Sequence, residues 1–209
     1  MQYNRVVRRA ILVAIAGTAF GCSTPSDAPK PSASAGSPPA AQNTRTSVVS
    51  GRVGPSAIVE LEPVGAELPL PEGPVIMDQY GKAFVPDLLL ARAGQVVEFR
   101  NSEDIDHNVQ VLRRPTGTTV LNESGSQGHM FRHTFEPGSY DVNCDIHPGM
   151  RAMIIASSTP YVAVADNRGE FTVSNVPSGR YTVKVTGDGH VKSQEVDVMG
   201  PRTVIAASP

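Results

Sequence analysis

The sequence CDIHPGM at residues 144–150 places three metal-binding side chains in one short stretch. Cys144, His147 and Met150 offer a thiolate, an imidazole and a thioether, each three residues after the one before. Pro148 and Gly149 lie between the last two and favour a turn over a continuing strand. The spacing therefore predicts a loop that folds back on itself and brings the three side chains to one point.

A fourth candidate ligand, His107, lies 37 residues before Cys144. Two imidazoles and one thiolate around a metal, with a long thioether contact, form the ligand set of blue-copper electron-transfer sites. We therefore predict one copper ion, cycling between Cu(I) and Cu(II), held by His107, Cys144, His147 and Met150. Zinc could use the three strong ligands, but the affinity order places copper above zinc. Taken singly, each of these residues is more often an ordinary packing or polar side chain.

Composition points to an all-β protein that does not bind nucleic acid. The 209 residues include 19 Gly and 18 Pro, no Trp, and two cysteines, Cys22 and Cys144. Many turns and few long helical windows favour strands. From Val75 to Ala156 about seven short strands follow one another at turn spacing, which suits a Greek-key sandwich. A formal net charge of −2 gives no sign of the basic stripe that nucleic acid requires.

Flanking residues extend the ligand pattern over about residues 75–156 and carry a family resemblance. They read Phe84-x-Pro86, then Gly94-x-x-Val97-x-Phe99-x-Asn101, then His107-Asn108-Val109, then Phe135-x-x-Gly138-x-Tyr140-x-x-x-Cys144-x-x-His147-x-x-Met150. This order resembles the plastocyanin and amicyanin branch of the cupredoxins. The chain departs from that pattern in a long polar segment from Arg113 to Gln127.

The resemblance implies roles for two further residues and a function. Asn108 would hydrogen-bond across to the Cys144 loop, and Pro148 would lie at the surface beside the edge of His147. In the family that edge is the electron exit, where a redox partner docks. We expect a one-electron carrier in the periplasm or at the cell surface. A copper store or chaperone, or a structural binding protein with a copper site that does not cycle, is the alternative.

An enzyme is not expected. Multicopper oxidases place a histidine directly before the cysteine, whereas this chain has Asn143 there. The dinuclear copper site through which electrons enter some oxidases needs two cysteines in this loop, whereas Cys144 is the only cysteine in it.

A second β unit is predicted from residues 160–209. It reads Asp166-x-x-Gly169-x-Phe171-x-Val173-x-x-Val176-Pro177-x-Gly179-x-Tyr181-x-Val183. This pattern resembles the carboxypeptidase regulatory-like, transthyretin-type sandwich. The Gly-x-Val opening of that family occurs at Gly51-Arg52-Val53, before the copper unit. We therefore expect one discontinuous sandwich from 47–72 and 157–209, with the cupredoxin domain 73–156 inserted. Alternatively, residues 48–62 add a strand pair to the copper domain.

The N-terminus has the features of an export signal. Residues 1–21 combine Arg5, Arg8 and Arg9 with an apolar stretch too short to span a bilayer, and we expect a signal peptide. Ala19-Phe20-Gly21-Cys22 resembles a bacterial lipobox, which implies lipidation of Cys22; ordinary cleavage nearby is the alternative. Residues 22–46 form a Pro/Ser/Ala-rich linker that we expect to be disordered. The predicted location is periplasmic or extracytoplasmic, with a membrane anchor if Cys22 is modified.

Other candidate residues carry weaker signals. Glu103, Asp104 and Asp106 form an acidic cluster that is either a solvated loop or an attraction for a basic partner such as a c-type cytochrome. His129 and His133, with Met130 between them, are expected to be exposed strand residues, and a surface patch that loads copper is the alternative. His190 lies by a turn and is expected to be solvated.

Overall fold

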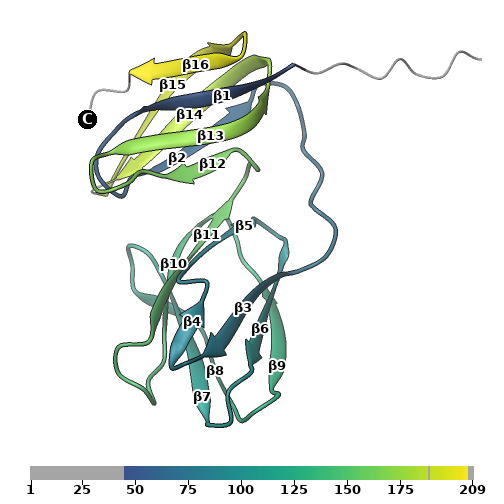
Figure 1. The fold of residues 1–209 in the computed structure, drawn as a ribbon, viewed down its shortest axis with the longest axis vertical. Coiled ribbons are helices and arrows are strands. Elements are labelled where there is room, and N and C mark those ends of the chain that lie inside the picture. Colours follow the sequence, from purple (N-terminus) through teal and green to yellow (C-terminus); the bar gives the residue numbers. More distant parts are fainter. Residues whose placement is uncertain (1–44, 188, 207–209) are drawn as a thin grey trace, which may run out of the picture. The chain divides into compact units, whose positions relative to one another are not determined.

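The computed structural model describes residues 45–187 and 189–206. The predicted signal peptide, Cys22 and nearly all of the predicted linker lie outside this part of the chain. The described residues form sixteen strands and no helix, which confirms the all-β prediction (Figure 1). It follows that they contain no helix long and apolar enough to cross a membrane.

Nine consecutive strands form two sheets around one core (Figure 1). One sheet has the strand order β5-β11-β10-β7-β8 and the other β4-β3-β6-β9. The strands are β3 (Val75–Tyr80), β4 (Ala83–Val85), β5 (Leu88–Arg92), β6 (Val96–Asn101), β7 (His107–Arg113), β8 (Thr118–Gly125), β9 (Met130–Thr134), β10 (Gly138–Asn143) and β11 (Arg151–Ser157).

Strand β10 leads directly into the predicted ligand loop. Its inward residues Tyr140 and Val142 are 1% and 0% exposed, and the alternation continues to Cys144 just past the strand end. Val142 pairs with Ala152 of β11 and with Val111 of β7 in the antiparallel ladder. The core between the two sheets therefore continues up to the thiol, because period-2 alternation sends these side chains to the same face.

The polar segment from Arg113 to Gln127 contains a strand that the sequence pattern did not predict. β8 pairs antiparallel with β7 and has exposed or half-buried residues along its whole length. It lies at the edge of its sheet and buries neither face fully. A strand of this kind has no apolar alternation to reveal it.

Seven further strands form two other sheets with a core of their own. The sheet orders are β13-β1-β16 and β12-β2-β14-β15. The strands are β1 (Thr46–Arg52), β2 (Ile58–Pro63), β12 (Val162–Val164), β13 (Glu170–Pro177), β14 (Gly179–Gly187), β15 (His190–Val198) and β16 (Arg202–Ala206). β1 and β2 thus pair with strands near the C-terminus rather than with β3–β11. β1 begins at Thr46, the last residue assigned above to the linker; the domain boundaries 47–72, 73–156 and 157–209 stay a prediction.

Each core contains a tyrosine that is fixed to the turn before its strand. The Tyr140 hydroxyl donates to the Glu136 carbonyl at 2.7 Å, and the Tyr181 hydroxyl donates to the Pro177 carbonyl at 2.9 Å. Both rings are buried, so the bond to a carbonyl four residues back satisfies a hydroxyl that water cannot reach. For Tyr140 this contact fixes the start of the strand that leads to Cys144.

Candidate metal centre

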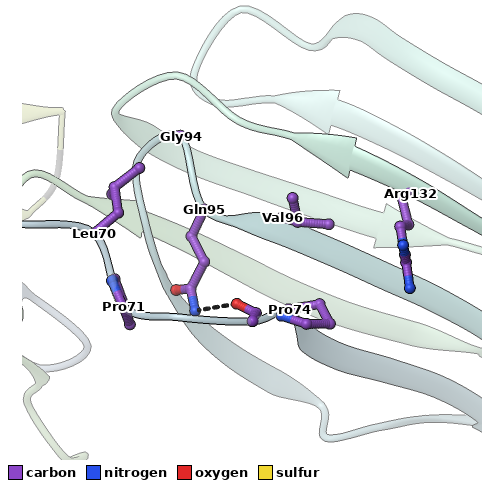
Figure 2. A pocket seen from close by; sticks show the side chains of 8 residues that line it. Leu70, Pro71, Pro74, Gly94, Gln95, Val96 and Arg132 are labelled. Carbon is purple, nitrogen blue, oxygen red and sulfur yellow. Dashed lines mark hydrogen bonds between the residues drawn. The ribbon is translucent and has the colours of Figure 1, made fainter.

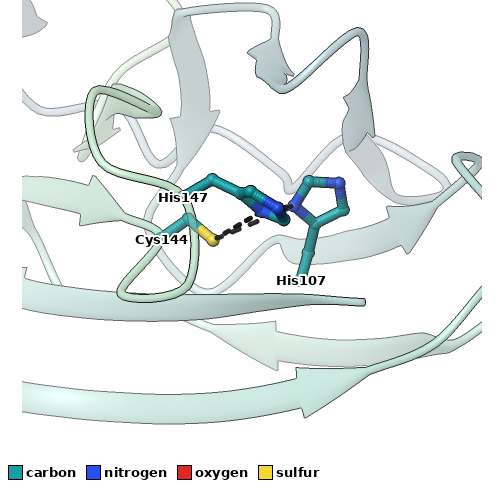
Figure 3. Close-up of side chains that lie close together, drawn as sticks. All are labelled: His107, Cys144 and His147. Atoms are coloured by element: carbon teal, nitrogen blue, oxygen red, sulfur yellow. Dashed lines mark hydrogen bonds between the residues drawn. The ribbon is translucent and has the colours of Figure 1, made fainter. Parts of the chain in front are cut away.

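The structure brings His107, Cys144 and His147 together at one end of the first core (Figure 3). Their donor atoms all lie within 4.8 Å of one another. Cys144 Sγ is 3.8 Å from His107 Nδ1 and 4.0 Å from His147 Nδ1, and the two Nδ1 atoms are 3.1 Å apart. His107 is the first residue of β7, and Cys144 follows the last residue of β10. Neighbouring strands therefore deliver ligands that are distant in sequence.

The loop from Cys144 to Met150 is closed by its own backbone. The Cys144 N–H donates to the Met150 carbonyl at 3.2 Å, and the Met150 N–H donates to the His147 carbonyl at 3.3 Å. Gly149 has a φ of 97°, which a residue with a side chain rarely adopts, so the glycine allows the turn. Met150 is 3% exposed and belongs to the same core cluster as Cys144.

The ring of His107 is oriented from behind by a carboxylate. His107 is completely buried, and its Nε2 lies 2.9 Å from Glu103 Oε2, which leaves Nδ1 directed at Cys144 and His147. The Glu103 carboxylate also accepts the Lys82 N–H at 2.9 Å. This Lys82 bond is the main cause that lowers the pKa of Glu103; partial burial opposes it, and His107 adds to it.

The sequence analysis missed this role of Glu103, which it considered only as part of an acidic cluster. Glu103 is partly buried, whereas Asp104 and Asp106 are exposed. Asn101 fixes the loop: its Oδ1 accepts the Glu103 N–H at 3.0 Å, and its Nδ2 donates to the Ile105 carbonyl at 2.8 Å. The available signal was a carboxylate four residues before a candidate ligand histidine, since ligating histidines commonly donate their second N–H to a carboxylate.

Asn108 connects β7 to the ligand loop. Its side chain is nearly fully buried, and its Oδ1 accepts the Asp145 N–H at 2.6 Å. The Gln79 side chain in turn donates to the Asn108 carbonyl at 3.1 Å. Across the loop, Pro148 and Gly149 are exposed and His147 is half-buried. The edge of the site around His147 is therefore the part that a partner could reach.

The other histidines form no comparable group among the described residues. The single cluster of at least three His, Cys, Asp or Glu ligands in that part of the chain is the one above. His129 Nε2 lies 3.6 Å from the exposed Glu123, and His190 is exposed. His133 packs its ring against Phe135, and the partial burial lowers its pKa.

A shallow pocket elsewhere shares no residue with this cluster. It has a volume of about 230 Å³, and its lining includes Leu70, Pro74, Gln95 and Arg132 (Figure 2). Gln95 Nε2 donates to the Gly73 carbonyl at 3.2 Å and holds the segment before β3 against this sandwich.

Two of the three comparisons with known proteins gave no match. No protein-family model and no curated protein matches the chain.

Three similar solved structures each match less than half of the chain. They include a purple cupredoxin from Nitrosopumilus maritimus, with TM-score 0.35 and 23% identity over 40% of this chain and 99% of that one. Amicyanin from Paracoccus versutus has TM-score 0.37 and 22% identity over 47% of this chain and 97% of that one. A Cu-containing nitrite reductase from Thermus scotoductus has TM-score 0.39 and 27% identity over 47% of this chain and 26% of that one. The function proposed below therefore depends on the site residues themselves.

Proposed function

We propose that this protein binds one copper ion through His107, Cys144 and His147, with Met150 as a weak axial ligand, and carries single electrons. The observation that supports this best is the convergence of one thiol and two ring nitrogens, all within 4.8 Å, from a strand and a loop far apart in sequence. Soft sulfur suits Cu(I) and imidazole suits Cu(II), so a mixed set serves both oxidation states.

The residues present fit such an ion. Bound copper would supply the one-electron couple; the protein supplies the fixed ligand positions. His107 offers Nδ1 because Glu103 occupies its Nε2, and Cys144 is buried and forms no disulfide within residues 45–187 and 189–206. The closed loop and the Asn108 contact would hold the ligands in place around the ion. Little then has to move when the charge of the site changes.

Electron exchange would take place at the edge of His147. Ile146 is 47% exposed beside this residue, and Pro148 and Gly149 are exposed after it. We propose a redox protein such as a c-type cytochrome as the partner. The exposed Asp104 and Asp106 near His107 would favour a basic partner, with association that weakens as salt rises.

The remaining assignments rest on sequence. We propose export to the periplasm or cell surface, lipidation at Cys22, a regulatory-like, transthyretin-type fold for the second sandwich, and no catalytic activity. Loss of membrane association in a Cys22→Ala variant would support the anchor, and an unchanged distribution would contradict it.

The test is to add Cu(II) to the full apoprotein and record the visible spectrum. We expect an intense thiolate-to-copper band that disappears in Cys144→Ser and in His107→Ala, because each variant removes a strong ligand. His133→Ala, which changes a histidine outside the cluster, is the control and should keep the band.

A colourless wild type, or colour that survives in Cys144→Ser, would contradict the proposal. A coloured protein that passes Cu(I) rapidly to an acceptor, with a potential far outside the range of c-type cytochromes, would favour a copper store or chaperone instead.

A further inference from the structure

Asp145, the residue directly after the thiol, is surrounded by carboxamides. Its Oδ2 accepts from Asn108 Nδ2 at 3.0 Å, from Gln110 Nε2 at 3.3 Å and from Asn122 Nδ2 at 3.3 Å. Asn108 Nδ2 also donates to Asn122 Oδ1 at 2.8 Å, which ties the donors together. We call Asn108, Gln110 and Asn122 the amide cradle.

The amide cradle holds a charge without a cation to neutralise it. Asp145 forms no ion pair within residues 45–187 and 189–206. Its backbone N–H is also bound, to Asn108 Oδ1 at 2.6 Å. Exposed side chains ordinarily change rotamer rapidly in water. Here both the backbone and the carboxylate of Asp145 are fixed.

Two strands supply the cradle. Asn108 and Gln110 belong to β7, the strand that begins with the candidate ligand His107. Asn122 belongs to β8, the polar edge strand for which the sequence analysis found no purpose. One polar side chain of that segment, Asn122, therefore binds the Asp145 carboxylate beside Cys144.

We propose that Asp145 tunes the reduction potential of the metal centre, and that the amide cradle keeps its charge in place. This inference rests on the function proposed above. A fixed negative charge beside the Cys144 thiolate favours the more positive oxidation state, Cu(II), and so lowers the potential. Asp145 acts through its charge and position and is not itself a ligand.

The expected size of the effect follows from its setting. Asp145 is exposed, so water screens part of its charge. Removing one unit charge near the metal at a protein surface then changes the redox equilibrium constant by about fivefold. That factor corresponds to ~40 mV, because tenfold is 59 mV for a one-electron couple.

The experiment is a redox titration of the copper-loaded full chain. Asp145→Asn removes the charge at nearly constant size. It should shift the redox equilibrium constant by about fivefold toward Cu(I), which raises the reduction potential. Asp197→Asn removes an equal charge from β15, which belongs to the other pair of sheets, and should change the constant by less than about twofold. Asp145→Glu keeps the charge and should stay close to wild type.

A variant that keeps the Asp145 carboxylate separates the effect of its charge from the effect of a disturbed structure. Asn122→Ala keeps the carboxylate but removes one N–H that compensates it, so the potential should fall or stay, never rise. Asn122 is exposed on an edge strand, so this change leaves the core intact.

The outcomes are distinct. If Asp145→Asn matches Asp197→Asn, or if Asp145→Glu and Asn122→Ala raise the potential as much as Asp145→Asn, Asp145 is structural and the inference is overturned while the electron carrier stands. If the wild type shows no thiolate-to-copper band, both are overturned together.

Discussion

The Glu103 carboxylate contacts the ring nitrogen of His107 that faces away from Cys144. A carboxylate in this position fixes the ring and raises its basicity as a ligand. The acceptor is itself fixed by the Lys82 N–H and by Asn101, so the buried histidine is held in a single orientation. The strength of the candidate site therefore depends on a residue outside the four ligands.

Glu103→Gln should weaken copper binding by about 10- to 100-fold, because the amide no longer provides a charged acceptor for His107. Competition with a Cu(I) chelator measures the affinity. Asp104→Asn is the matched control, since it removes an exposed charge from the same loop and should change the affinity by less than about twofold. Equal losses in both variants would show that only the net charge of the loop matters.

Single residues also mark the limit of sequence reasoning. The types and spacing of Cys144, His147 and Met150 predicted a converging loop, since ligands three residues apart in a Pro-Gly turn have few other uses. Glu103 offered only its position four residues before His107 as a signal. Asp145 offered none, because its role comes from side chains that approach in space, such as Gln110, which is 35 positions away along the chain.

Among the secondary-structure elements, β6 and β9 are joined by a carboxylate that lies between two exposed arginines. Glu98 points away from the core between Val97 and Phe99, yet its side chain is 2% exposed. Its carboxylate binds Arg132 of β9 at 2.8 Å and Arg100 of β6 at 2.7 Å. Arg132 first, and then Arg100, lower the pKa of Glu98 below its ordinary value of 4.5.

This contact predicts how stability depends on pH. A carboxylate with a lowered folded-state pKa stabilises the fold above its unfolded-state pKa and loses that effect as pH falls through the folded-state pKa. Glu98→Gln should therefore be less stable than wild type at about pH 7, with a gap that narrows as pH falls below 4.5 and closes once it has passed the lowered pKa of Glu98. Urea unfolding of the apoprotein measures this. Glu67→Gln, at an exposed position, should show no such trend, and a constant gap for Glu98→Gln would refute the explanation.

The strands themselves were predictable to different degrees. β10 and β14 show apolar residues at every second position because each covers a core with one face. β8 does not, because an exposed edge strand carries polar side chains on both faces. Hydrophobic alternation therefore found the strands that make the cores and missed the one that supplies Asn122.

At the scale of the whole molecule, the described residues form two separate hydrophobic cores, and only one of them contains predicted ligands. One contains Cys144 and Met150 together with the inward residues of β3–β11. The other is built from β1, β2 and the C-terminal strands and contains none of the predicted ligands.

Leu61→Ala in the second core should lower the free energy of unfolding by about 2–5 kcal/mol, because it leaves a cavity. The visible band of the folded, copper-loaded protein should not move. Val142→Ala in the first core, two residues before Cys144 on the same face, should lower stability and copper affinity together. Calorimetry and spectroscopy on the same samples make the comparison. A shifted band in Leu61→Ala would show that the second core shapes the metal centre.

The hydrogen bonds that close the Cys144–Met150 loop bear on how the site responds to metals other than copper. A loop held by its own backbone hydrogen bonds should present the same side chains to any ion that reaches it, so its shape does not select one metal over another. Silver(I), like copper(I), prefers sulfur ligands but has no accessible second oxidation state. We therefore expect it to bind at the site and abolish the visible band. Titration of the copper-loaded protein with silver nitrate, followed by absorbance, would show whether silver displaces copper from the proposed site.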